Sequence, residues 1–177
     1  MNSIVGSRTL PTFLEFHAAT RPDETALTTE TQAGVRQKLT WYELNALANQ
    51  TARWILRQGL KHGDSFALGL SNCLELYLLW LAAGKTGTVA VPIDPGSTLP
   101  ELAYIVEHSD ARLLVALESG REVAAEAVRR CPLAKRLVEV SLRAPFPATD
   151  LGREVIRESD ERPPADVKSL DVAGMLY

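Results

Sequence analysis

Between residues 65 and 140 the sequence alternates between short apolar runs and longer amphipathic runs. The expected order is strand 65–70, helix 74–85, strand 88–91, helix 99–109, strand 112–116, helix 119–130 and strand 136–140. A helix between two successive strands is typical of parallel pairing, because parallel neighbours need a long crossover connection. We therefore predict an α/β fold with a mostly parallel sheet.

The residues before this alternation predict a helix and a hairpin. Thr9-Leu10-Pro11 places a proline near the start of a helix, and Arg21-Pro22 ends it. Two runs of strand type, 25–30 and 35–40, are separated by Gln-Ala-Gly. The short separation favours an antiparallel hairpin.

Capping-box spacing predicts where the following helices begin. Thr40 and Glu43 have this spacing, so a helix should begin there and end near Gly59. Thr98 and Glu101 repeat the spacing, and Asn72 with Glu75 offers a weaker version. The helix after Thr40 has an apolar side and an opposite polar face, which consists of Asn45, Asn49, Gln50, Arg53 and Arg57.

The last quarter of the sequence is less regular. Residues 141–170 have fewer apolar positions and four prolines, which predicts a surface connection with one short helix at 150–158. Residues 171–177 then return to a buried-strand pattern, on which the sequence ends. We expect one domain over residues 1–177, with 141–170 as a connection inside it.

Composition excludes several classes of protein. With 177 residues, 46% hydrophobic and 23% charged, the chain has the composition of a soluble globular domain. A net charge of −3 without a basic stripe argues against a nucleic-acid partner. The longest apolar run, 76–84, is about half a membrane span, and the N-terminus has no export signal. Two distant cysteines indicate a cytoplasmic location.

The most site-like string, Gly84-Lys85-Thr86, resembles the end of a nucleotide-binding phosphate loop. The motif requires a further glycine where this sequence has Leu79, and it requires a strand before it and a helix after it. Here the order is reversed. The string is therefore interpreted as a helix end, with Lys85 near the negative pole of the helix dipole and Gly87 turning the chain.

The remaining reactive residue types receive structural interpretations. Neither cysteine has the neighbours of a nucleophile or a metal site, and no histidine belongs to a triad pattern. Two acidic pairs lie beside prolines in expected loops, and one aspartate is expected to cap a turn. These residues are Cys73, Cys131, His17, His62, His108, Asp23, Glu24, Asp160, Glu161 and Asp94.

Three strings together resemble the N-terminal part of the adenylate-forming superfamily. They are LTWYELNALANQTARWIL at 39–56, LYLLWLAAGKTGTVAVPIDP at 76–95 and STLPELAYIVEHSDARLLV at 97–115. That superfamily comprises acyl- and aryl-CoA synthetases, adenylation domains of nonribosomal peptide synthetases, and firefly luciferase. The resemblance implies the N-terminal subdomain of the adenylate-forming fold, over about residues 9–177.

In that family the strand resembling 171–177 leads into a loop rich in Ser, Thr and Gly that wraps the phosphates of ATP. This sequence is truncated before that loop. The groups that bind adenine and ribose, the magnesium-binding Glu and the Lys of the C-terminal domain all lie beyond it. The resemblance therefore assigns no catalytic, cofactor-binding or metal-binding residue to this chain.

The correspondences that remain are architectural. Thr40, Glu43 and Leu44 match a helix start of the family, and the run from Lys85 to Pro92 matches a helix-to-strand turn through Gly87 and Val91. Gly84 departs from the family, which usually has a large apolar residue at this position.

For the whole protein the resemblance implies an acid–thiol ligase that uses ATP, Mg and CoA. It activates a carboxylic acid as an acyl-adenylate and then forms a thioester, while this chain alone is expected to be inactive. Its partner would be the remainder of the same synthetase. A CoA ligase is favoured, and two alternatives remain: a peptide-synthetase adenylation domain, or a non-catalytic short or split binding protein.

Overall fold

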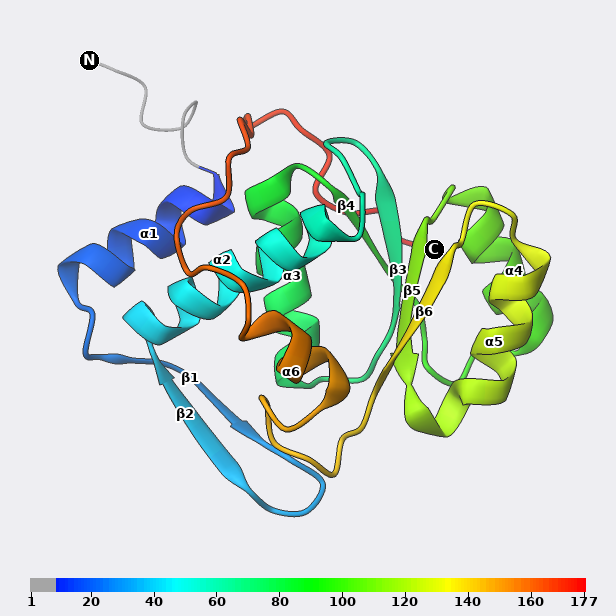
Figure 1. Cartoon of the computed structure of the whole chain (residues 1–177), viewed down its shortest axis with the longest axis horizontal. Helices are drawn as coiled ribbons and strands as arrows, with labels where there is room; N and C mark the ends of the chain where they lie inside the picture. Colours follow the sequence, from blue (N-terminus) through cyan, green and yellow to red (C-terminus); the bar gives the residue numbers. More distant parts are fainter. Residues whose placement is uncertain (1–8) are drawn as a thin grey trace.

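The computed structural model describes residues 9–177 and contains a four-stranded parallel sheet (Figure 1). Its strands lie in the order β4-β3-β5-β6, and each of the three neighbouring pairs is parallel. They span β3 (Ser65–Gly69), β4 (Val89–Pro92), β5 (Leu113–Leu117) and β6 (Arg136–Val140). The predicted α/β fold with a parallel sheet is confirmed.

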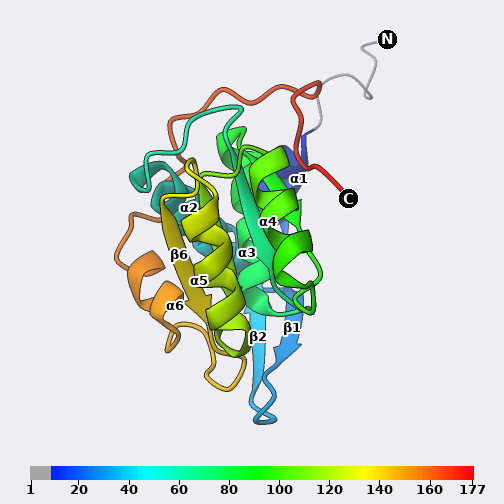
Figure 2. The same cartoon turned by 90° about the vertical axis from the view of Figure 1, so that its right-hand side faces the viewer.

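Helices cover both faces of this sheet (Figures 1 and 2). One face carries α2 (Trp41–Arg57), α3 (Leu74–Thr86) and α6 (Asp150–Val155), and the other carries α4 (Leu99–His108) and α5 (Arg121–Arg130). A short 3₁₀ helix, Glu118–Gly120, precedes α5. Within β3, Phe66 and Leu68 enter the first core while Ala67 enters the second. Burial on both faces explains why the strands are apolar at successive positions.

The N-terminal elements also follow the prediction. Helix α1 (Leu10–Thr20) lies against α2 and α3, and β1 (Thr25–Glu30) pairs antiparallel with β2 (Arg36–Thr40). This hairpin forms a separate two-stranded sheet, which extends away from the helices in Figure 1.

Two of the three predicted capping boxes are present. The backbone N–H of Thr40 donates to Glu43 Oε2 at 2.8 Å, and the N–H of Thr98 donates to Glu101 Oε2 at 2.8 Å. The expectation for Asn72 is wrong. Cys73, and not Asn72, occupies the N-cap of α3, and its side chain makes no capping bond. Glu75 points into the interior, where it is 5% exposed and bonded to Thr149, so it does not close a capping box.

Residues 141–170 are more than a surface connection. Phe146, Leu151 and Val155 are buried in the same core as α2 and α3. The short helix ends at Val155 and not at 158, and its N-cap Thr149 accepts a hydrogen bond from the N–H of Gly152 at 3.0 Å. The few apolar residues of this stretch are enough to cover one end of the sheet, which the low apolar density did not indicate.

The predicted buried strand at 171–177 is also corrected. Only one bridge forms, between Ala90 and Gly174, and it runs parallel to β4. Two hydrogen bonds make it, from Ala90 N to Ala173 O at 3.2 Å and from Met175 N to Ala90 O at 3.0 Å. Leu176 is 78% exposed, because this segment lies at the sheet edge with a strand neighbour on one side only.

Candidate functional site

The sheet reverses its winding between two neighbouring strands, β3 and β5. The connection that leaves β3 forms α3 on one face, and the connection that leaves β5 leads to α5 on the other face. In open α/β sheets, ligands bind outside the carboxyl ends of the strands at such a switch point. This edge is therefore the candidate functional site.

Two hollows mark the carboxyl edge. The larger has a volume of about 410 Å³, and a smaller one of about 60 Å³ shares Gln32, Ser141 and Leu142 with it. The hairpin reaches this edge, since the N–H of Gln32 donates to Leu142 O at 3.0 Å and the Gln37 amide donates to Phe146 O. A loop from outside the parallel sheet thus borders the hollows at this edge.

A buried carboxyl group lies beneath the smaller hollow. Glu75 Oε1 accepts a hydrogen bond from Thr149 Oγ1 at 3.2 Å, and both residues are buried. Burial raises the pKa of Glu75, and the bonds from its own backbone N–H, Thr149 and Cys73 oppose this change only in part. No lysine, arginine or histidine of the described chain forms an ion pair with Glu75. Glu75 is therefore a carboxyl group in the wall of the hollow whose ionised form is disfavoured by burial.

Neither cysteine is activated as a nucleophile. Burial, followed by other effects that include the Glu75 carboxylate, raises the pKa of Cys73 to about 12. Burial also raises the pKa of Cys131, whose thiol donates to Ala103 O at 3.4 Å. A thiol reacts through its thiolate form, so both residues act as small packing groups, as the sequence predicted.

Lys85 is not a phosphate ligand. Its side chain is 1% exposed, and Nζ donates to Glu15 Oε1 at 3.1 Å and to Asn45 Oδ1 at 3.0 Å. Burial lowers the pKa of Lys85, and the bond to Glu15 counteracts it. Gly87 has a φ of 71° and ends α3, which confirms the predicted helix end. The buried pairing with α1 was not predicted, because Glu15 is seventy positions away in the sequence.

The three histidines occupy separate places. His17 is buried in the last turn of α1, where its Nδ1 accepts from Arg21 Nε at 3.0 Å, which agrees with a structural role at a helix end. His62 Nε2 lies 2.9 Å from Asp171 Oδ2, and His108 Nδ1 lies 2.7 Å from the Tyr177 hydroxyl. None faces the carboxyl-edge hollows, whose lining residues do not include them.

The acidic residues that the sequence placed in loops keep structural roles. Glu24 pairs with Arg21 at 3.6 Å and Glu161 with Arg53 at 3.7 Å. Asp94 Oδ1 accepts from the N–H of Gly96 at 2.8 Å, which confirms the predicted turn. Among residues 9–177, no group of three or more His, Cys, Asp or Glu side chains could hold a metal ion.

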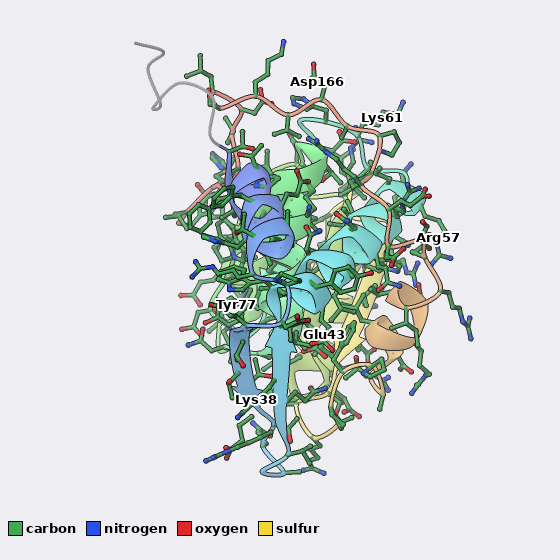
Figure 3. All side chains as sticks on the ribbon, turned by 90° about the vertical axis from the view of Figure 1, so that its left-hand side faces the viewer. Lys38, Glu43, Arg57, Lys61, Tyr77 and Asp166 are labelled. Atoms are coloured by element: carbon green, nitrogen blue, oxygen red, sulfur yellow. The ribbon has the colours of Figure 1, made fainter. Side chains whose placement is uncertain are left out.

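The polar face of α2 has a function that the sequence did not reveal. Asn49 Nδ2 donates to Asp160 O at 2.7 Å, Gln50 Nε2 to Glu158 O at 3.0 Å, and Arg53 Nε to Glu161 O at 3.0 Å. Arg57 adds an ion pair with Glu158 at 2.5 Å, and Figure 3 shows it at the end of α2 beside the segment that follows α6. This face therefore binds a passing backbone segment and is not simply solvated.

Comparison with known proteins agrees with this architecture. The family described as AMP-binding enzyme matches residues 14–177. The crotonobetaine/carnitine–CoA ligase of Citrobacter koseri is 35% identical over 112 residues, which are 63% of this chain and 22% of that protein. The matched region thus spans less than a quarter of the length of this relative.

Two solved structures show the same fold. The N-terminal domain of FACL13 from Mycobacterium tuberculosis is 23% identical, with a TM-score of 0.78, and the match covers 95% of this chain and 41% of that one. Apo MatB from Rhodopseudomonas palustris is 26% identical, with a TM-score of 0.75, over 96% of this chain and 32% of that one. No described helix has the length and apolar character needed to cross a membrane.

Proposed function

Because the chain belongs to the AMP-binding enzyme family, we propose that it works as the N-terminal part of an ATP-dependent acyl- or aryl-CoA synthetase. Such an enzyme joins a carboxylate to the α-phosphate of ATP with release of pyrophosphate, and a CoA thiol then displaces AMP. The family match over residues 14–177 carries the proposal, and the CoA ligase among the similar proteins supports it.

The described residues do not fit ATP, Mg or CoA by themselves. The only string that resembles a phosphate loop has its lysine buried in an ion pair with Glu15, and residues 9–177 offer no group of metal ligands. Phosphate chemistry depends on cations and donors that are held in position. We therefore assign no adenylation step to these residues, and we propose that the remainder of the synthetase supplies those groups.

The proposed partner is thus the rest of the same enzyme. The exposed apolar side chains near the sheet edge support this proposal, since Val172 is 61% exposed and Leu176 is 78% exposed. Large exposed apolar patches mark interaction surfaces. We also propose a cytoplasmic location, which is supported by the two free cysteines.

A chimera tests the proposed function. The chain would replace the corresponding region of the Citrobacter koseri ligase, and pyrophosphate exchange with ATP would be measured over a panel of carboxylic acids. We expect exchange in the chimera and only background in the 177-residue chain alone. Exchange by the chain alone, or a folded chimera without exchange, would contradict the proposal.

The thiol acceptor separates the two enzyme classes. The active chimera would be supplied with CoA in one reaction and with a phosphopantetheinyl carrier protein in another. Because the acceptor site also includes residues of the ligase, the unmodified ligase is the matched control. A shift of preference toward the carrier protein would favour the adenylation-domain alternative.

A further inference from the structure

A third cavity lies far from the carboxyl edge. It has a volume of about 220 Å³, is open to one side, and is lined by the start of α1, the C-terminal half of α3 and the segment 167–173. Because α3 runs antiparallel to the strands that flank it, this half of the helix lies toward the amino edge of the sheet. Most of the lining is apolar, and it consists of Leu10, Pro11, Trp80, Ala83, Val172 and Ala173 together with Gly84, Gly87, Val167 and four polar residues.

Gly84 lines the cavity next to Pro11 and Leu10. A Cβ atom at this position would lie 3.4 Å from Pro11 Cδ and 3.8 Å from Leu10 Cδ2, which is ordinary contact. A methyl group could therefore be accommodated at residue 84, whereas a larger side chain would have to enter the cavity or displace Pro11 and Leu10. In this chain α3 presents no side chain at residue 84, and the space next to Trp80 stays open.

Contacts outside the cavity hold its outer wall. Asp171 is bound by His62 at 2.9 Å, and the backbone of residues 173 and 175 is bound to Ala90. Gly174 lies so close to Trp80 that a Cβ atom would be 2.7 Å from Cη2. The segment that forms this wall is therefore held in place by bonds to His62 and Ala90, and it needs no ligand in the cavity to stay there.

We propose that this cavity is a binding site for a small, uncharged, planar aromatic molecule of about the size of indole. Apolar cavities of about 150 Å³ stay dry and bind benzene, so about 220 Å³ is enough for a bicyclic ring. Trp80 offers an aromatic partner for such a ring. A charged ligand would lose its hydration. The charged residues of the lining are Asp171, which is already bound to His62, and Lys168, which is exposed to solvent.

This inference does not depend on the proposed ligase function. The cavity lies at the opposite end of α3 from Glu75 and the carboxyl-edge hollows. A bound ligand would contact both α3 and the segment 167–173, and it would thus favour the docked position of that segment over its release.

Calorimetric titration of the 177-residue chain with indole tests the proposal. Gly84→Leu should weaken binding at least tenfold, because a leucine side chain there must enter the cavity or displace Pro11 and Leu10 from its lining. Gly120→Leu should bind indole as the unmodified chain does. Gly120 is the matched control because a Cβ atom there meets nothing within 4 Å. Indole-3-carboxylate should bind at least tenfold more weakly than indole.

A second variant covers the case in which Gly84→Leu does not fold. Val172→Asp changes a lining residue that is 61% exposed, so the fold should persist while indole binding falls at least tenfold. Absence of indole binding up to its solubility limit would overturn the proposal, and so would unchanged affinity in the folded variants. A chain without residues 1–8 that binds indole tenfold more tightly would also overturn it, since the cavity would then belong to the chain's own N-terminal segment.

Discussion

The α4–α5 layer comes from one continuous stretch, residues 99–130, whereas the opposite layer combines helices that begin at Trp41, Leu74 and Asp150. In the α4–α5 layer each helix packs beside the strand that follows it, as the alternation of elements requires. In the other layer α6 is held to α2 by contacts between distant residues, including a bond from Trp54 Nε1 to Glu154 Oε2 at 2.8 Å. Periodicity alone therefore explains one layer, and specific side chains are needed for the other.

The largest effect is expected from Trp54→Ala. Trp54 is fully buried and joins α2 to α6, so its truncation should lower the free energy of unfolding by about 3–5 kcal/mol. Urea unfolding measures the loss. Hydrogen exchange should accelerate more in 150–158 than in 121–130, and equal acceleration would mean that the two layers are not separately held.

A smaller loss is expected from Val106→Ala in the other layer. Val106 is 1% exposed in the core of α4, and removal of two methyl groups should cost about 2 kcal/mol. The same urea experiment applies. In this layer the stability should be shared among many similar local contacts. A decrease in the free energy of unfolding as large as that of Trp54→Ala would contradict this.

Thr40→Ala should lower the free energy of unfolding by about 1 kcal/mol, because it removes the N-cap of α2. Thr98→Ala, which removes the corresponding cap of α4, is the matched variant in the other layer. Similar losses would show that caps contribute equally to both layers. An unchanged urea midpoint with an unchanged slope would mean that the Thr40 cap is not formed.

The smallest effect is expected from Glu75→Gln and depends on pH. Because burial raises the pKa of Glu75, the folded state holds this proton more tightly than the unfolded state. The stabilisation is therefore complete below the ordinary pKa of 4.5 and is lost as the pH rises through the folded-state pKa.

Glu75→Gln removes this dependence and should raise the free energy of unfolding at pH 7 by about 0.5 kcal/mol. Urea unfolding at pH 4 and pH 7 measures the difference between variant and unmodified chain. A variant that is less stable at pH 7 would indicate that the carboxylate is stabilised by its neighbours.

Much of the fold could be predicted from the sequence because its signals are local. The Thr40–Glu43 and Thr98–Glu101 boxes each lie within one helical turn, and the glycine at residue 87 marks the end of α3 directly. Asn72 and Glu75 have a related spacing, yet Glu75 turns inward to Thr149. Spacing does not show whether the interior offers a competing partner seventy-four positions away.

Fewer features of the candidate site could be predicted from the sequence. The interpretation of Gly84-Lys85-Thr86 as a helix end is correct, but the partners of Lys85 could not be read from the string. The polar residues on one face of α2 have the pattern that is typical of a solvated surface. In the fold this face binds backbone carbonyl groups of residues 156–162. Such hydrogen bonds cannot be predicted from the amino-acid composition of the accepting segment, because every residue has a backbone carbonyl group.

By itself the sequence determined the order of the helices and strands, the parallel sheet and the absence of a phosphate loop at Lys85, because periodicity, caps and glycine turns act over a few residues. Only the tertiary structure decided where residues 141–177 lie, which carboxyl group is buried and where α3 leaves a cavity beside Gly84. Those outcomes depend on contacts between residues that are far apart in the chain, and packing, unlike local propensity, is settled only when all elements are in place.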